Sequence, residues 1–151
     1  MKKKWALFVG VFAILSAGYW AVSGWLSQPR DTLQWAQQVT AEQIARVELV
    51  VSPADPEKCY RELAPEEYET VALLLQQSMG SYVPEPEPLA GGGVTLYLTM
   101  TDGSTHQVSN NGNVYLVIDG ESFDAPYDRL LLWQEMGFDW GDSPAPEGID
   151  W

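Results

Sequence analysis

Hydrophobic and polar residues alternate over positions 94–101 of this chain. The apolar side chains share one parity and the polar or aromatic ones the other: Val94, Leu96, Leu98 and Met100 against Thr95, Tyr97, Thr99 and Thr101. Successive side chains of a strand point to opposite faces of a sheet, so the pattern predicts a strand with one buried and one solvated face. Positions 114–118 repeat the alternation.

Three glycine-containing pairs punctuate this region: Asp102-Gly103, Asn111-Gly112 and Asp119-Gly120. Such pairs are typical of tight hairpin turns, because glycine adopts positive φ freely and an Asx residue tolerates it. We therefore expect an antiparallel meander over residues 93–125. A sheet with one apolar face needs a cover, which the rest of the chain must supply.

Residues 46–52 and 58–62 read as two further strands. Val47, Leu49 and Val51 face one way along the first strand, opposite Arg46, Glu48 and Val50. The interval between the two strands contains Pro53 and Pro56. Proline cannot donate to a β ladder, so we expect a loop there.

The clearest helix signal covers residues 65–79. Proline is favourable in a first helical turn, glutamates follow it, and Gly80 stands where a helix would stop. The apolar residues recur at helical spacing: Tyr68, Val71, Ala72, Leu75 and Met79. We expect this helix to cover the buried face of the meander.

Three weaker signals complete the domain. A short helix is expected over residues 32–39, followed by a capping box from Thr40 to Gln43. The proline- and glutamate-rich residues 83–88 predict an extended, solvated connector. A last helix is expected over residues 126–136, with these packing residues: Tyr127, Leu130, Leu131 and Trp133. Together the patterns predict an α+β domain whose mainly antiparallel sheet, of about five strands, is covered on one face by helices.

An uncharged run of 22 residues, 5–26, precedes the domain and follows three lysines. It is long enough to cross a hydrocarbon core of about 30 Å, and the lysines place the N-terminus in the cytoplasm. We expect a cytoplasmic stub (1–4), a transmembrane signal anchor (5–26), an extracytoplasmic domain (27–137) and a disordered acidic tail (138–151). The alternative is a cleaved signal with Ala21 and Ser23 before the cut, which would release a secreted protein.

The exported part is strongly acidic: five basic residues stand against 21 acidic ones, which leaves a net charge of −16. Such a surface repels phosphate backbones and argues against nucleic-acid partners. It favours a protein or a cationic partner at the cell surface, or serves solubility alone. The single Cys59 cannot form an internal disulfide, which leaves a half-buried thiol or an intermolecular bond.

The chain offers few residues for site chemistry. His106 is the only histidine, and we expect it at a sheet margin as an ordinary polar residue. One histidine and one cysteine do not suffice for a zinc site or a catalytic triad, and no phosphate loop is present, so no cofactor is expected. Residues 119–124 loosely match the start of a calcium loop without its terminal glutamate. Paired carboxylates for acid–base chemistry stay open because acidic residues are plentiful.

The solvated sheet face is the candidate interaction surface. Its predicted members are Val50, Thr95, Tyr97, Thr99, Tyr115 and Val117. Tyrosine-rich surfaces with few charges favour protein contacts, while ordinary cross-strand pairing on a wet sheet is the alternative.

The order TAEQIARVELVVSP, KCYRELAPEEYETVALLLQQS, GGVTLYLTMTDG and NGNVYLVIDGESFDAPYDRLL, over residues 40–133, resembles small uncharacterised domains that Gram-positive bacteria export and anchor to the membrane. The resemblance implies the fold and the export, and it implies no catalytic or binding residue. We therefore expect a non-enzymatic interaction or sensory module. A secreted ligand- or cation-binding protein and a carboxylate-based hydrolase are the alternatives.

Overall fold

The structure is a computed structural model of the whole chain, and it describes residues 14, 16, 29–112, 114–126, 128, 131–133 and 141–149. Apart from Ile14 and Ser16, the predicted membrane anchor lies outside the described residues. Within that described part of the chain, no helix is both long and apolar enough to cross a membrane.

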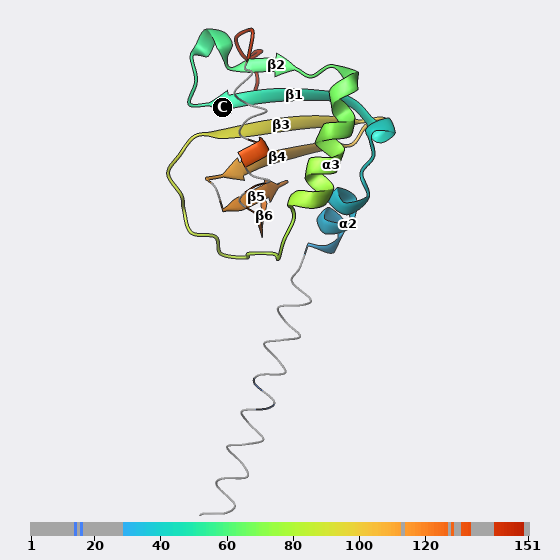
Figure 1. Cartoon of the computed structure of the whole chain (residues 1–151), viewed down its shortest axis with the longest axis vertical. Helices are drawn as coiled ribbons and strands as arrows, with labels where there is room; N and C mark the ends of the chain where they lie inside the picture. The colour runs from blue at the N-terminus through green and yellow to red at the C-terminus, as the bar shows by residue number, and fades with distance from the viewer. Residues whose placement is uncertain are drawn as a thin grey trace, which may run out of the picture.

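The domain is built on one antiparallel sheet of six strands in the order β2-β1-β3-β4-β5-β6 (Figure 1). The strands are β1 (Ile44–Ser52), β2 (Tyr60–Glu62), β3 (Gly93–Met100), β4 (Thr105–Asn111), β5 (Tyr115–Ile118) and β6 (Glu121–Asp124). The predicted antiparallel α+β class is confirmed. The sheet has six strands where about five were expected, and the last of them pairs with β5 after the Asp119-Gly120 turn.

Helices lie on one face of this sheet (Figure 1). The α-helices are α2 (Arg30–Gln38) and α3 (Tyr68–Ser78), and the short 3-10 turns are η1 (Ala41–Gln43), η2 (Pro56–Lys58) and η3 (Pro65–Glu67). The predicted helix from position 65 therefore opens as a 3-10 turn and becomes α-helical at Tyr68. Before η1, Thr40 N donates to Gln43 Oε1 over 3.0 Å, which is one half of the predicted capping box.

The core lies between α3 and the sheet. Val71 and Leu75 of α3 are fully buried in one cluster with Leu96 and Leu116 of the meander. The alternation along β3 is reproduced as a strict alternation of buried and half-buried residues. The prediction that this helix roofs the apolar face of the meander is therefore confirmed.

Trp133 closes the core as its largest fully buried side chain. Its Nε1 donates to the buried Ser78 Oγ over 3.0 Å, which joins the C-terminal helical residues to α3. Leu131, predicted to pack as well, is 39% exposed, so that prediction is wrong. Residues two apart on a helix point to nearly opposite sides, so Leu131 and Trp133 cannot face the core together. Tyr127 and Leu130 lie outside the described residues.

The hairpin turns place their glycines as predicted, with one difference in detail. Asp119 and Gly120 both have positive φ, 52° and 85°, as a two-residue turn of the primed kind requires. In the first hairpin only Gly103 is left-handed, and its N–H donates to Met100 O over 3.0 Å. That hairpin therefore has a longer loop, which ends on the left-handed glycine.

Both outer strands of the sheet are partnered by short segments of the chain itself. On the β6 side, Gly80 N donates to Asp124 O and Asp124 N donates to Ser81 O. On the β2 side, Tyr60 forms an antiparallel bridge with Ser143. The expectation of a disordered tail is therefore wrong for residues 141–149, which Figure 1 draws in red beside β2.

Candidate functional site

The six residues of the predicted interaction surface lie on strands β1, β3 and β5, with parity opposite to the core. Five of them are half-buried: Thr95, Tyr97, Thr99, Tyr115 and Val117. Val50 is only 2% exposed, so its placement on a wet surface is wrong. It forms a second apolar cluster with Cys59 and Tyr60, against which Ala145 and Ile149 of the C-terminal segment pack.

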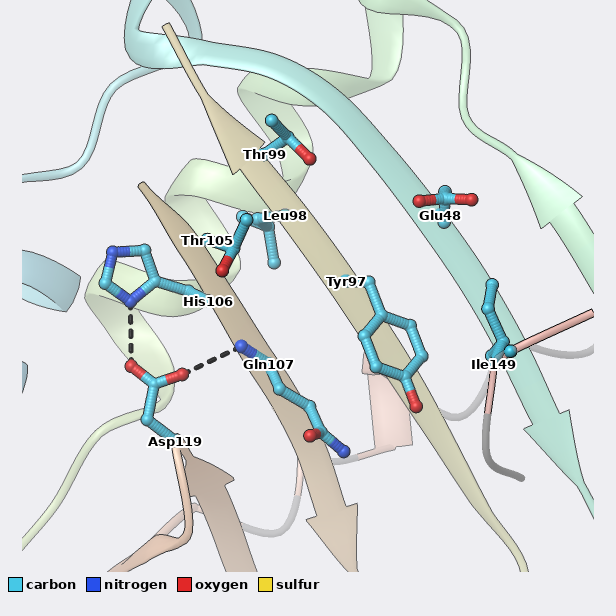
Figure 2. A pocket seen from close by; sticks show the side chains of 10 residues that line it. Glu48, Tyr97, Leu98, Thr99, Thr105, His106, Gln107, Asp119 and Ile149 are labelled. Atoms are coloured by element: carbon cyan, nitrogen blue, oxygen red, sulfur yellow. Dashed lines mark hydrogen bonds and ion pairs between the residues drawn. The ribbon is translucent and has the colours of Figure 1, made fainter. Parts of the chain in front are cut away.

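The open part of this face is hollowed into a groove of about 540 Å³ (Figure 2). Strands β1, β3 and β4 form its floor, and the C-terminal segment adds Gly148 and Ile149 to its wall. Of the six predicted surface residues, only Tyr97 and Thr99 line it. Sequence reasoning therefore found the face but missed the groove, since one wall comes from a segment expected to be disordered.

Four side chains stand in one row across the groove, from neighbouring strands. The register pairs Glu48 with Tyr97, and Tyr97 with Gln107. The row ends at Asp119, whose Oδ1 accepts from Gln107 N over 2.8 Å. With strands about 4.8 Å apart, the Cα atoms of Glu48 and Asp119 are separated by about 14 Å. Two carboxylates therefore flank a phenol ring and a neutral amide (Figure 2).

The Glu48 end of the row belongs to a charged network on β1 and β2. Glu48 Oε1 accepts from Tyr60 OH over 2.8 Å and lies 3.1 Å from the guanidinium of Arg46. The same guanidinium is 2.8 Å from Glu62, and this hydrogen bond raises the pKa of Arg46. Burial and the hydrogen bond to Glu48 raise the pKa of Tyr60. Glu48 is thus held in a fixed position, with a side chain only 16% exposed.

The Asp119 end of the row contains an arrangement that the sequence did not predict. Asp119 Oδ2 lies 2.7 Å from His106 Nδ1, and the His106 ring stacks on Trp35 with centroids 3.7 Å apart and planes at 22°. His106 was expected to be an ordinary polar residue at the margin of the sheet. No local signal joins it to Trp35, because the contact connects α2 with β4 across distant parts of the sequence.

The adjoining hairpin adds a further carboxylate near His106. Asp102 Oδ1 accepts from both the hydroxyl and the N–H of Ser104, at 2.7 and 2.9 Å. These hydrogen bonds, with a smaller contribution from His106, lower the pKa of Asp102. Asp102 therefore stays ionised to lower pH than a free aspartate, and it adds negative charge beside this end of the groove.

The two carboxylates at the ends of the row, Glu48 and Asp119, are not placed as an acid–base pair. Glu48 and Asp119 stand at opposite ends of the row, whereas the paired acid and base of glycosidases lie within about 10 Å of each other. Among the described residues, no three His, Cys, Asp or Glu side chains are placed to hold a metal ion. Both carboxylate oxygens of Asp119, the first residue of the loosely calcium-like stretch, already have protein partners.

Asp119 supports a testable prediction about the turn. Asp119→Ala would place alanine, which has no polar side chain to stabilise a left-handed conformation, at a φ of 52°. It would also remove the carboxylate that accepts from Gln107 N–H. We expect the free energy of unfolding to fall by about 1–3 kcal/mol in a urea titration. Asp119→Asn keeps an acceptor and the tolerance for positive φ, so its loss should be clearly smaller. Equal stability of the alanine variant and the native protein would contradict the role given to this turn.

In comparisons with known proteins, the chain matches no family model, no curated protein and no solved structure. The fold and the groove define a small α+β domain with a polar, acidic hollow on the open face of its sheet. Any function for the domain must therefore be argued from its own residues.

Proposed function

We propose that this protein is a non-enzymatic binding module, held outside the cytoplasm by residues 5–26, whose sheet groove receives a positively charged group of a partner protein. The groove carries the proposal, because it combines a cavity with an aromatic floor and carboxylates at both ends. Among the described lining residues, His106 is the only one that can carry a positive charge, and it is paired with Asp119.

The chemistry of the lining favours a cationic group over an anionic or purely apolar one. Glu48 and Asp119 give the lining its negative charge, part of which Arg46 and His106 offset. Tyr97 offers a ring face to which an ammonium or guanidinium is attracted. Thr99, Thr105 and Gln107 add neutral hydrogen-bonding groups along the floor. The net charge of −16 on residues 27–151 adds a long-range attraction for a cationic partner.

Export and anchoring are supported by the sequence. The run 5–26 is uncharged, lysines precede it, and every acidic residue follows it. The resemblance to exported domains of Gram-positive bacteria points the same way. Cleavage after this run would instead give a secreted binding protein with the same groove.

Photo-cross-linking from inside the groove tests the proposed function. A benzoylphenylalanine in place of Tyr97, in the full-length protein in its own membrane, should give a discrete protein adduct on irradiation. The adduct should weaken in 1 M salt, where the Debye length falls to about 3 Å, and with Glu48→Gln. The same probe at Glu66, an exposed residue of η3, is the matched control.

Three outcomes would count against the proposal. The first is no adduct from position 97, and the second is the same adducts from positions 97 and 66. The third is turnover of a hydrolysable substrate by the purified full-length protein, abolished by Glu48→Gln, which would favour the carboxylate-based enzyme.

A further inference from the structure

The C-terminal segment 141–149 is bound to the domain as a ligand would be. Tyr60 N donates to Ser143 O over 3.0 Å, while Asp142 N and Ser143 N donate to Tyr60 O over 2.9 and 3.3 Å. The Ser143 hydroxyl has two acceptors within reach, Tyr60 O at 3.3 Å and Asp142 Oδ1 at 3.0 Å. Such main-chain pairing with the outer strand of a sheet is how many extended peptides are recognised.

The position of Gly141 gives this pairing its specificity. Gly141 is buried, and a Cβ atom added there would overlap Tyr60 N, Lys58 O and Cys59 C. These are backbone atoms of β2 and the turn before it, so they cannot move aside as a flexible side chain can. The site therefore accepts glycine at this position and excludes every larger residue.

Apolar contacts complete the attachment. Ala145 and Ile149 pack against the cluster of Val50, Cys59 and Tyr60 on the face away from α3. The segment that fits therefore has three features. It has glycine at position 141, a residue at 143 whose backbone pairs with Tyr60, and apolar residues at 145 and 149. The stretch 141–149, GDSPAPEGI, supplies all of these.

The attachment is also limited, because β2 begins at Tyr60 and is preceded by the turn η2, so no partner strand continues past the pair of Tyr60 and Ser143. Each backbone hydrogen bond contributes only about 0.5–1.5 kcal/mol net, so a pairing of this length opens more readily than the central strands. A segment held in this way can leave its place and be replaced by an equivalent one.

We propose that the outer edge of β2, together with the Val50, Cys59 and Tyr60 cluster, is a peptide-binding site that segment 141–149 occupies as an internal ligand, and that its external ligand is the same segment of a second copy of this chain. The requirements of the site are met by this sequence itself, which is the reason for choosing a second copy as the occupant. The inference does not depend on the proposed function, although Gly148 and Ile149 also line the groove. Release of the segment would therefore remove one wall of that groove.

The internal segment has the advantage in a single molecule. Tethering gives it an effective concentration on the order of millimolar, which a free segment must exceed in order to compete. The isolated protein should therefore be closed on itself, and exchange should appear only when copies are crowded or the internal segment is disabled.

The test uses the full-length protein with Gly141→Val as receptor and a fluorescein-labelled synthetic peptide of residues 141–149 as probe, followed by fluorescence anisotropy. Valine should displace the internal segment, so we expect the peptide to bind this variant at least roughly tenfold more tightly than the native protein, which is about 1.4 kcal/mol. A peptide with valine in place of its glycine should lose at least a comparable factor. Ser143→Pro removes both the N–H and the hydroxyl of Ser143 as donors to Tyr60 O, and it provides a second receptor in case Gly141→Val does not fold, as judged by circular dichroism.

Sedimentation equilibrium then identifies the occupant. The native protein should form dimers as its concentration rises, and Gly141→Val should form none, because a chain with valine at this position cannot donate its segment. Equal peptide binding by the native and variant receptors, or no binding by either, would overturn the peptide site. Peptide binding with a native protein that stays monomeric up to millimolar concentration would overturn the second copy as its ligand.

Discussion

Trp133→Ala is expected to destabilise the domain by about 3–5 kcal/mol, the range for truncating a buried aromatic side chain. Trp133 is fully buried, the largest side chain in that state, and its Nε1 hydrogen bond satisfies the buried hydroxyl of Ser78. The substitution would open a cavity and also leave Ser78 Oγ without this donor. Chemical denaturation followed by far-ultraviolet circular dichroism measures the loss.

Trp133→Phe is the matched control for this prediction. Phenylalanine retains much of the buried ring but cannot donate to Ser78 Oγ, so the loss should be smaller, at about 1–3 kcal/mol. If alanine and phenylalanine cost the same, the hydrogen bond rather than the packing would dominate. If neither changed the midpoint, residues 131–133 would not close the core.

Leu75→Ala is expected to cost about 2–5 kcal/mol, because Leu75 is fully buried in the cluster that joins α3 to the meander. Leu73 provides the control, since it lies on the same helix and is 45% exposed. Leu73→Ala should change the free energy of unfolding by no more than about 0.5 kcal/mol. Both variants are measured by urea titration. If their m-values are equal, the difference between their free energies of unfolding directly measures the contact between α3 and the sheet.

Similar losses for the two leucine variants would contradict the arrangement of α3 on the sheet. They would mean that helix propensity, which both substitutions change alike, outweighs burial. The comparison of Leu75→Ala with Leu73→Ala therefore separates two contributions to the free energy of unfolding. One is the packing of α3 on the sheet, and the other is the intrinsic helix propensity.

The elements that the sequence predicted well are those specified by neighbouring residues. The parity of Val94 and Leu96, the Asp119-Gly120 turn and the spacing of Val71 and Leu75 each depend on a few adjacent positions. Steric limits on φ and the burial of one face act over that same range, so local pattern and structure agree.

The features that escaped prediction join distant parts of the chain. The stack of Trp35 on His106 and the bridge between Tyr60 and Ser143 depend on how the finished sheet presents its edges. Pro144 and Pro146 suggested disorder, yet the pairing residues, Asp142 and Ser143, precede them. Val50 was assigned to solvent from strand parity alone, and parity cannot show that a later segment covers that face.

The burial of Cys59 has a consequence for the reactivity of its thiol. Its side chain is fully shielded, and its thiol donates to Pro56 O over 3.4 Å. A thiol that solvent cannot reach reacts slowly with oxidants and disulfides. Ala145 and Ile149 pack against the cluster that contains Cys59, so this segment acts as a seal between the sulfur and reagents in solution.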